Sequence, residues 1–152
     1  RCGNNGCVEL YSSNAAIIDS VQKELEKGIK SSLAEVYEKN RCLEITDIVE
    51  AAKSNDMLAY KAFISAAEYM VICLDNVIKM FDPEEIIFYC KWMEQLPDIF
   101  NMVVNQVFNN TKFINRNELR IKLNTNKHIM TKGAAALQYD LIFRSYKDCP
   151  LL

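Results

Sequence analysis

Two cysteines near the start of the chain are the residues best suited to chemistry. Cys2 and Cys7 stand five positions apart, with Gly3 and Gly6 between them. Glycine reaches positive φ angles without steric cost, so this spacing is typical of a tight loop that turns both sulfurs toward one point. Thiolate is a preferred zinc ligand, but a closed structural zinc site takes four ligands and this loop offers two. On spacing alone, the loop is either half of a metal site or a turn that contains cysteines.

A redox pair is the other chemistry open to these cysteines. Thiol oxidoreductases use Cys-x-x-Cys, whereas four residues separate Cys2 from Cys7, so the spacing disfavours this role. Further along, Cys42, Cys73 and Cys90 sit among apolar or helical neighbours. Cysteine buries readily as a small hydrophobe. We therefore expect reduced core thiols and a cytoplasmic protein.

Composition restricts the class of protein and its partners. The 152 residues suit a single unit, 1–152, and half of them are hydrophobic while a quarter are charged. The net charge of -2 and the pI near 5.5 argue against a large basic surface for nucleic acid. No apolar run approaches the roughly 18 residues of a membrane span. We expect neither DNA nor a membrane as a direct partner of this chain.

The first half of the chain predicts helices. Asn14 is expected to cap an amphipathic helix with an apolar series at Ile17, Val21, Leu25, Ile29 and Leu33. Its other face carries lysines and glutamates, which we interpret as a solvated surface. Thr46 is expected to cap a short helix that ends near Ala52, and Asn55-Asp56 to begin the longest helix, which reaches about Met80.

The second half predicts strands that alternate with helices. Pro83 ends the long helix, and the apolar run 86–89 is typical of a strand covered on both faces. A helix follows at 97–108, then a strand with one polar face at 119–123, and Thr131 is expected to cap a last helix. His128 stands in a polar loop and is expected to be exposed. The order strand, helix, strand, helix favours an α/β class with parallel strands and a helical crossover.

The opening loop resembles that of the ROK family, which comprises repressors, open reading frames and sugar kinases. The family pattern is Cys-x-Cys-Gly-x-x-Gly-Cys-x-Glu. This chain matches the pattern, in the same spacing, at Cys2, Gly3, Gly6, Cys7 and Glu9. Later segments also resemble the family in the right order: Ala51-Ala52-x-x-Asn55-Asp56, Asp82-Pro83-Glu84-Glu85 and Gly133-Ala134-Ala135. In the family the first zinc cysteine and a zinc-binding histidine lie upstream of this loop. The resemblance thus implies the C-terminal part of a longer protein.

This resemblance implies a fold, two ligand roles and several partners. The fold would be the C-terminal lobe of an actin-like (ribonuclease-H-like) ATPase fold, helix-rich with few strands. Cys2 and Cys7 would hold a structural zinc ion in the intact protein, and Glu9 would bind a sugar hydroxyl through its carboxylate. The intact protein would be a sugar-responsive transcriptional repressor of carbohydrate metabolism. It would contact DNA through an N-terminal module, and we expect homo-oligomers, since surface that belongs against the other lobe would be exposed.

The alternative from another class is a ROK sugar kinase similar to glucokinases. Kinase members place a Gly-Gly turn after the strand that Ile86-Ile87-Phe88 represents here, where the backbone approaches the nucleotide. This chain has Tyr89-Cys90 at that place, and the resemblance puts the catalytic aspartate in the upstream half. We therefore name no catalytic residue and expect neither this chain nor its parent to be a kinase. A third reading is a family member kept for assembly alone, which the presence of Glu9 disfavours.

Overall fold

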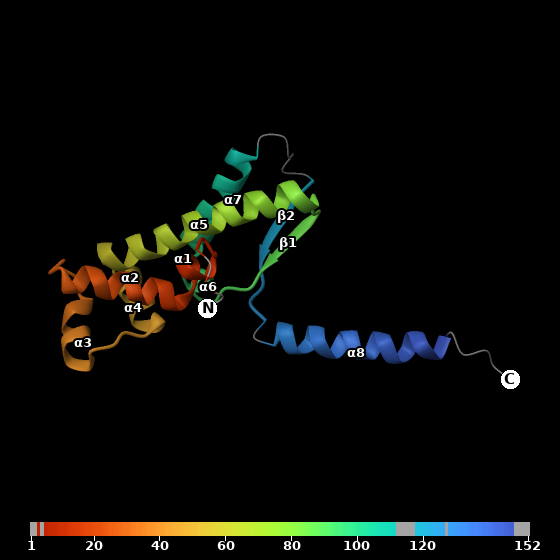
Figure 1. The fold of residues 1–152 in the computed structure, drawn as a ribbon, viewed down its shortest axis with the longest axis horizontal. Helices are drawn as coiled ribbons and strands as arrows, with labels where there is room; N and C mark the ends of the chain where they lie inside the picture. Colours follow the sequence, from red (N-terminus) through yellow and green to blue (C-terminus); the bar gives the residue numbers. More distant parts are fainter. Residues whose placement is uncertain (1–2, 4, 112–117, 127, 148–152) are drawn as a thin grey trace.

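The molecule is organised around one long central helix. The computed structural model describes residues 3, 5–111, 118–126 and 128–147 (Figure 1). Helix α5 (Met57–Phe81) buries seven residues along one face, among them Ala59, Phe63 and Ile78. Helices α1, α2, α4 and α7 pack against it. The prediction that the longest helix begins after Asn55-Asp56 is confirmed.

The other described elements are shorter helices and two short strands. The other helices are α1 (Glu9–Ser12), α2 (Asn14–Glu26), α3 (Leu33–Asn40), α4 (Ile45–Lys53), α6 (Lys91–Gln95), α7 (Pro97–Asn110) and α8 (Ile129–Lys147). The strands are β1 (Glu85–Phe88) and β2 (Arg120–Leu123). Helix α8 extends away from the rest of the chain (Figure 1). The predicted α/β class is confirmed, and the short helices α1, α3 and α6 add to the predicted order.

The predicted helix over 14–33 is in fact two helices. Helix α2 ends at Glu26, and Gly28 follows with φ of +83° in a linker. This left-handed conformation interrupts the right-handed helix and favours glycine. Ile29 is consequently exposed, and Leu33 is buried as the first residue of α3. The apolar spacing continued across the break because both helices bury one face against the same core.

Three predicted helix starts are corrected by the structure. The N-cap of α2 is Ser13, whose Oγ accepts a hydrogen bond from the Ala16 N–H at 3.2 Å, so Asn14 is already helical. The N-cap of α4 is Glu44 rather than Thr46, because the Asp47 carboxylate accepts from the Glu44 N–H at 2.8 Å. Helix α8 begins at Ile129, ahead of Thr131.

The two strands form a parallel pair with α7 in the crossover. Glu85 pairs with Arg120 and Phe88 with Leu123, and α7 lies between the strands in the sequence. One sheet face contributes half-buried residues to the core: Ile86, Phe88, Ile121 and Leu123. Ile87, on the other face, is 59% exposed. The prediction of parallel strands is confirmed, and that of a strand covered on both faces is wrong for this chain.

The central helix meets a length and mean-hydropathy criterion for a membrane span, although charged residues interrupt its apolar runs. Among the described helices, α5 alone is long and apolar enough to cross a membrane, with a mean hydropathy of 1.5 over an 18-residue window. Its buried residues lie against neighbouring helices; the Phe63 and Trp92 rings, for example, have centroids 4.9 Å apart. A core helix meets the same criterion, and the packing of α5 is that of a core helix.

Candidate functional site

The opening loop is built around glycines with left-handed backbone angles. Gly3 has φ of +83° and Gly6 has φ of +84°, and neither has heavy atoms close to the place of a Cβ. The cost of a side chain there would therefore be backbone strain rather than a clash. Cys7 follows, half-buried, and its carbonyl oxygen accepts a hydrogen bond from the Leu10 N–H at 2.9 Å. The loop thus leads directly into α1.

The predicted zinc pair is described at one of its two positions. Cys2 lies outside the described residues, so the separation of the Cys2 and Cys7 sulfurs stays a prediction. In the described ranges, the structure brings together no group of three or more histidine, cysteine, aspartate or glutamate side chains that could hold a metal ion. His128 is exposed, as predicted, and stands just before α8.

The prediction of core thiols is confirmed for one of the three later cysteines. Cys90 is half-buried and packs against the core, Cys73 is half-buried outside the core cluster, and Cys42 is exposed in the loop before α4. Burial raises the pKa of the Cys90 thiol, although hydrogen bonds from the Met93 and Trp92 backbone oppose the rise. Cys90 is therefore held as a neutral thiol at pH 7, the form that is not nucleophilic.

Glu9 is exposed at the first position of α1, a short helix packed against both α2 and α5. Two neighbours on α1 hold it in place: Ser12 is buried, and Tyr11 stacks on Tyr69 of α5 with ring centroids 4.4 Å apart. The Glu9 carboxylate is therefore open to a ligand while its backbone is anchored.

The stack of Tyr11 on Tyr69 is a contact that reasoning from the sequence missed. The two residues are far apart along the chain, and Tyr69 is 39% exposed beside the buried face of α5. The sequence offered only a weak indication of this stack. A tyrosine beside the buried face of α5 can contact a neighbouring element or enter the core, and the sequence pattern does not distinguish the two. The stack joins α1, which carries Glu9, to the central helix.

At the end of β1, two side chains stand where the resemblance places a glycine pair. Tyr89 is 39% exposed, and Cys90 is half-buried as the N-cap residue of α6. A glycine pair would leave this turn open to a ligand that approaches the backbone. Here the turn carries a large ring and a thiol instead.

The carboxylate of Asp56 serves the structure itself. Asp56 accepts hydrogen bonds from the Leu58 and Ala59 N–H groups at 3.0 Å, which caps α5. Its second oxygen accepts from Ser31 Oγ at 2.9 Å, and from the Ser32 N–H and Oγ at 2.7 and 2.9 Å. Burial alone would raise the pKa of Asp56, but these hydrogen bonds outweigh it and hold the pKa below its ordinary value.

Comparison with known proteins gives one family throughout. The model of the ROK family matches residues 1–140. The xylose repressor of Bacillus spizizenii is 29% identical over 106 residues, which cover 70% of this chain and 24% of the repressor. The xylose repressor of Caldicellulosiruptor bescii is 27% identical, over 74% of this chain and 28% of that protein. The chain thus spans about a quarter of the length of the curated relatives it matches.

Among solved structures, one regulator and one kinase-like protein illustrate the range. A ROK family transcriptional regulator, described as a homologue of the E. coli MLC protein, has a TM-score of 0.67 and 28% identity over 81% of this chain and 30% of its own. A putative sugar kinase from Cytophaga hutchinsonii has a TM-score of 0.70 over 87% of this chain and 44% of its own. Its identity is 18%, so this second likeness shows a shared fold alone.

Proposed function

Because the chain belongs to the ROK family, we propose that it is the sugar-sensing C-terminal part of a cytoplasmic transcriptional repressor of carbohydrate metabolism. Its fold is the C-terminal lobe of the actin-like fold shared by ROK regulators and kinases, helix-rich with few strands, as the resemblance implied. In the intact protein, an N-terminal module would bind DNA. Sugar bound between the two lobes would change their arrangement and so the affinity for the operator.

The observation that carries the proposal is the kind of protein to which the sequence is similar. The curated relatives at 27–29% identity are named repressors, and the regulator is the structural neighbour with comparable identity. Likeness to a kinase is limited to the fold. The end of β1 supports the same choice, because the exposed ring of Tyr89 and the half-buried Cys90 stand where a kinase backbone approaches its nucleotide.

Glu9 is the residue that we propose to bind the sugar. An exposed carboxylate on an anchored helix can accept two strong hydrogen bonds from neighbouring sugar hydroxyls. The names of the relatives make xylose the first sugar to test. The other sugar contacts would come from the lobe that this chain does not include.

Two further properties belong to the same proposal. Cys2 and Cys7 would hold zinc in the intact protein, which the left-handed Gly3 and Gly6 support by giving the loop its tight turn. Self-association is supported by exposed hydrophobic side chains on the protruding α8: Leu137, Tyr139, Leu141, Ile142 and Phe143.

The test is calorimetric titration of the intact protein with xylose, hexoses and N-acetylated sugars, with and without ATP. We expect sugar binding that ATP does not change and that weakens at least about tenfold in Glu9→Ala, because hydrogen bonds to a charged group contribute about 1.5–3 kcal/mol. Glu35→Ala, which removes an exposed glutamate from α3, is the matched control and should bind normally. Phosphorylated sugar as a product would restore the kinase, and absence of any sugar binding would leave an assembly role.

A further inference from the structure

A groove runs between α2 and α5 on the side of the molecule that carries α1. Its volume is about 640 Å³, and its floor is formed by buried residues, among them Ile17, Val21 and Ala66. The groove exists because α5 presents small side chains, Ala62, Ser65 and Ala66, where the larger residues of α2 leave space above them. The floor is apolar, and its side chains are almost fully covered by their neighbours, so the large hydrophobic side chains still open to solvent lie at the two ends of the groove.

Both ends of the groove carry large hydrophobic side chains that are exposed. At the end where α2 begins, the stacked rings of Tyr11 and Tyr69 are 40% and 39% exposed. At the other end stand Ile29, 46% exposed, and Met57, 64% exposed. Exposed apolar groups gathered around one groove mark a surface that another apolar group covers.

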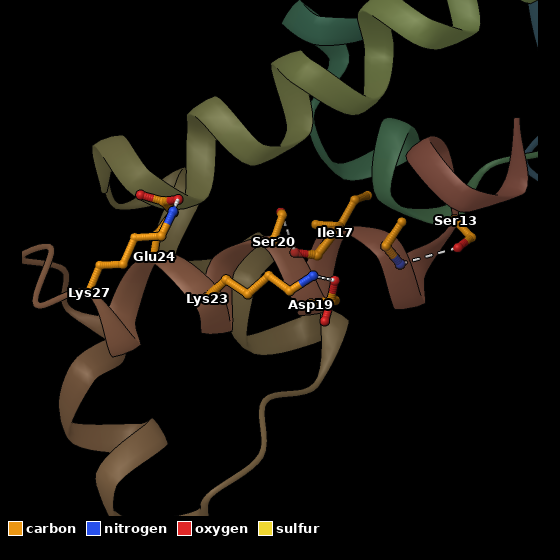
Figure 2. Close-up of polar contacts among 8 residues, drawn as sticks. Ser13, Ile17, Asp19, Ser20, Lys23, Glu24 and Lys27 are labelled. Carbon is orange, nitrogen blue, oxygen red and sulfur yellow. Dashed lines mark hydrogen bonds and ion pairs between the residues drawn. The ribbon is translucent and has the colours of Figure 1, made fainter. Parts of the chain in front are cut away.

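Lysines line the edges of the groove. Lys23 and Lys27 of α2 each make an exposed pair with an acidic neighbour one turn away, Lys23 Nζ with Asp19 at 2.6 Å and Lys27 Nζ with Glu24 at 2.6 Å (Figure 2). Such exposed pairs contribute little to stability, so a partner's carboxylate can replace either acid at little cost.

Two more lysines add uncompensated charge. Lys30 follows α2 and Lys61 projects from α5, and neither forms an ion pair with another residue in the described part of the chain. The four lysines that line the groove exceed its two acids, Asp19 and Glu24, by two charges, although the whole chain carries a net charge of -2. The groove is therefore a locally positive edge around an apolar floor.

We propose that the groove between α2 and α5 binds an acidic amphipathic helix of a partner protein. The apolar face of such a helix would lie in the groove, over its apolar floor, and contact the hydrophobic residues at both ends. Its carboxylates would meet the lysines on either edge, which sets orientation and excludes basic partners. A small polar ligand would leave the hydrophobic side chains at both ends of the groove in water. A second copy of this chain, docked by the same face, would bring lysines against lysines.

The test uses two synthetic peptides of about 16 residues, long enough for four helical turns. Both carry leucines spaced by three or four positions; one has glutamates beside that stripe and the other has lysines at the same places. Each is labelled with fluorescein and titrated with the 152-residue chain, and binding is measured by fluorescence anisotropy at low and high salt. We expect the glutamate peptide to bind, more weakly at high salt, and the lysine peptide not to bind.

Variants locate the binding in this groove. Lys27→Glu combined with Lys61→Glu should weaken binding of the glutamate peptide at least about tenfold, since two attractions become repulsions. Lys39→Glu is the control, because it makes the same lysine-to-glutamate replacement at an exposed position of α3. It should bind like the original chain. Both lysines of the double variant are exposed, and circular dichroism would verify that it is folded.

Three results would overturn the proposal. Equal binding of the two peptides would show that the charges do not select the partner. Unchanged binding in the double variant would place the peptide elsewhere. A dimer in sedimentation that the double variant abolishes would show that a second copy occupies the groove. None of these outcomes depends on Glu9, so the sugar-sensing role is tested separately.

Discussion

Asp56 connects two parts of the chain, and its replacement gives a quantitative test of the fold. One carboxylate oxygen caps α5 through the Leu58 and Ala59 N–H groups, and the other accepts three hydrogen bonds from Ser31 and Ser32. Loss of an N-cap costs about 1 kcal/mol. Loss of the half-exposed serine contacts should cost about 1.5 kcal/mol more. We therefore expect Asp56→Ala to lower the free energy of unfolding by about 2.5 kcal/mol.

A second variant separates the two halves of this effect. Asp56→Asn keeps an oxygen that can cap α5, but its amide group cannot accept the hydrogen bonds from Ser32. It should therefore lose about 1.5 kcal/mol. Asp19→Ala removes an exposed partner of Lys23 and should stay within about 0.5 kcal/mol of the original chain.

The assay is urea denaturation followed by circular dichroism, with unchanged slope m as evidence that the same surface unfolds. The pH dependence adds an independent readout. Because the folded pKa of Asp56 is lowered, its contribution is present above the unfolded-state pKa of about 3.9 and is lost as pH falls through the folded value. The difference between the original chain and Asp56→Asn should thus vanish in strong acid.

Either of two outcomes would refute this account of Asp56. A loss below about 1 kcal/mol in Asp56→Ala would mean that the carboxylate contributes no more than an ordinary cap. Equal losses in Asp56→Ala and Asp56→Asn would mean that the cap itself contributes nothing.

Two further predictions concern the intact protein and the isolated chain. Elemental analysis of the purified intact protein should find about one zinc per chain, and Cys7→Ser should remove it; full retention of zinc in that variant would place the metal elsewhere. Light scattering of the 152-residue chain at high concentration should show oligomers, and Leu141→Glu on the exposed surface of α8 should reduce them. A monomer at every concentration would contradict the self-association part of the proposal.

Much of the fold was predictable where local signals agreed with packing. Helix α5 was predictable from its apolar stripe, its cap at Asp56 and the proline that follows it, Pro83. Each of these signals acts within a few residues, so its effect does not depend on the tertiary context. Asn55 is a further case. It stands where the family pattern has glycine and adopts φ of +64°, a left-handed angle that asparagine tolerates better than most other residues. The substitution therefore preserves the backbone turn before α5.

Other features depended on contacts that the sequence pattern does not contain. The series from Ile17 to Leu33 has helical spacing throughout, and Gly28 in its left-handed conformation divides it. Ile87 belongs to an apolar run like that of a buried strand, but no described element covers it. Exposure of a strand face depends on what packs there, and periodicity reports the residue types alone.

The candidate site divides in the same way. Residue identity and spacing were enough to single out Glu9 and the cysteine loop, because those groups lie within nine residues of one another. Nothing local indicated that Tyr11 would stack on Tyr69, or that Lys61 would face the lysines of α2 across an apolar groove.

The sequence by itself therefore determined the long helix α5, the strands β1 and β2 and the family pattern, since capping, periodicity and glycine conformation are short-range effects. Only the tertiary structure decided which side chains are buried, which contact another element and which line an exposed groove. Burial is a sum over neighbours that come from distant parts of the chain: the small residues of α5 leave a groove only because α2 crosses them at that position.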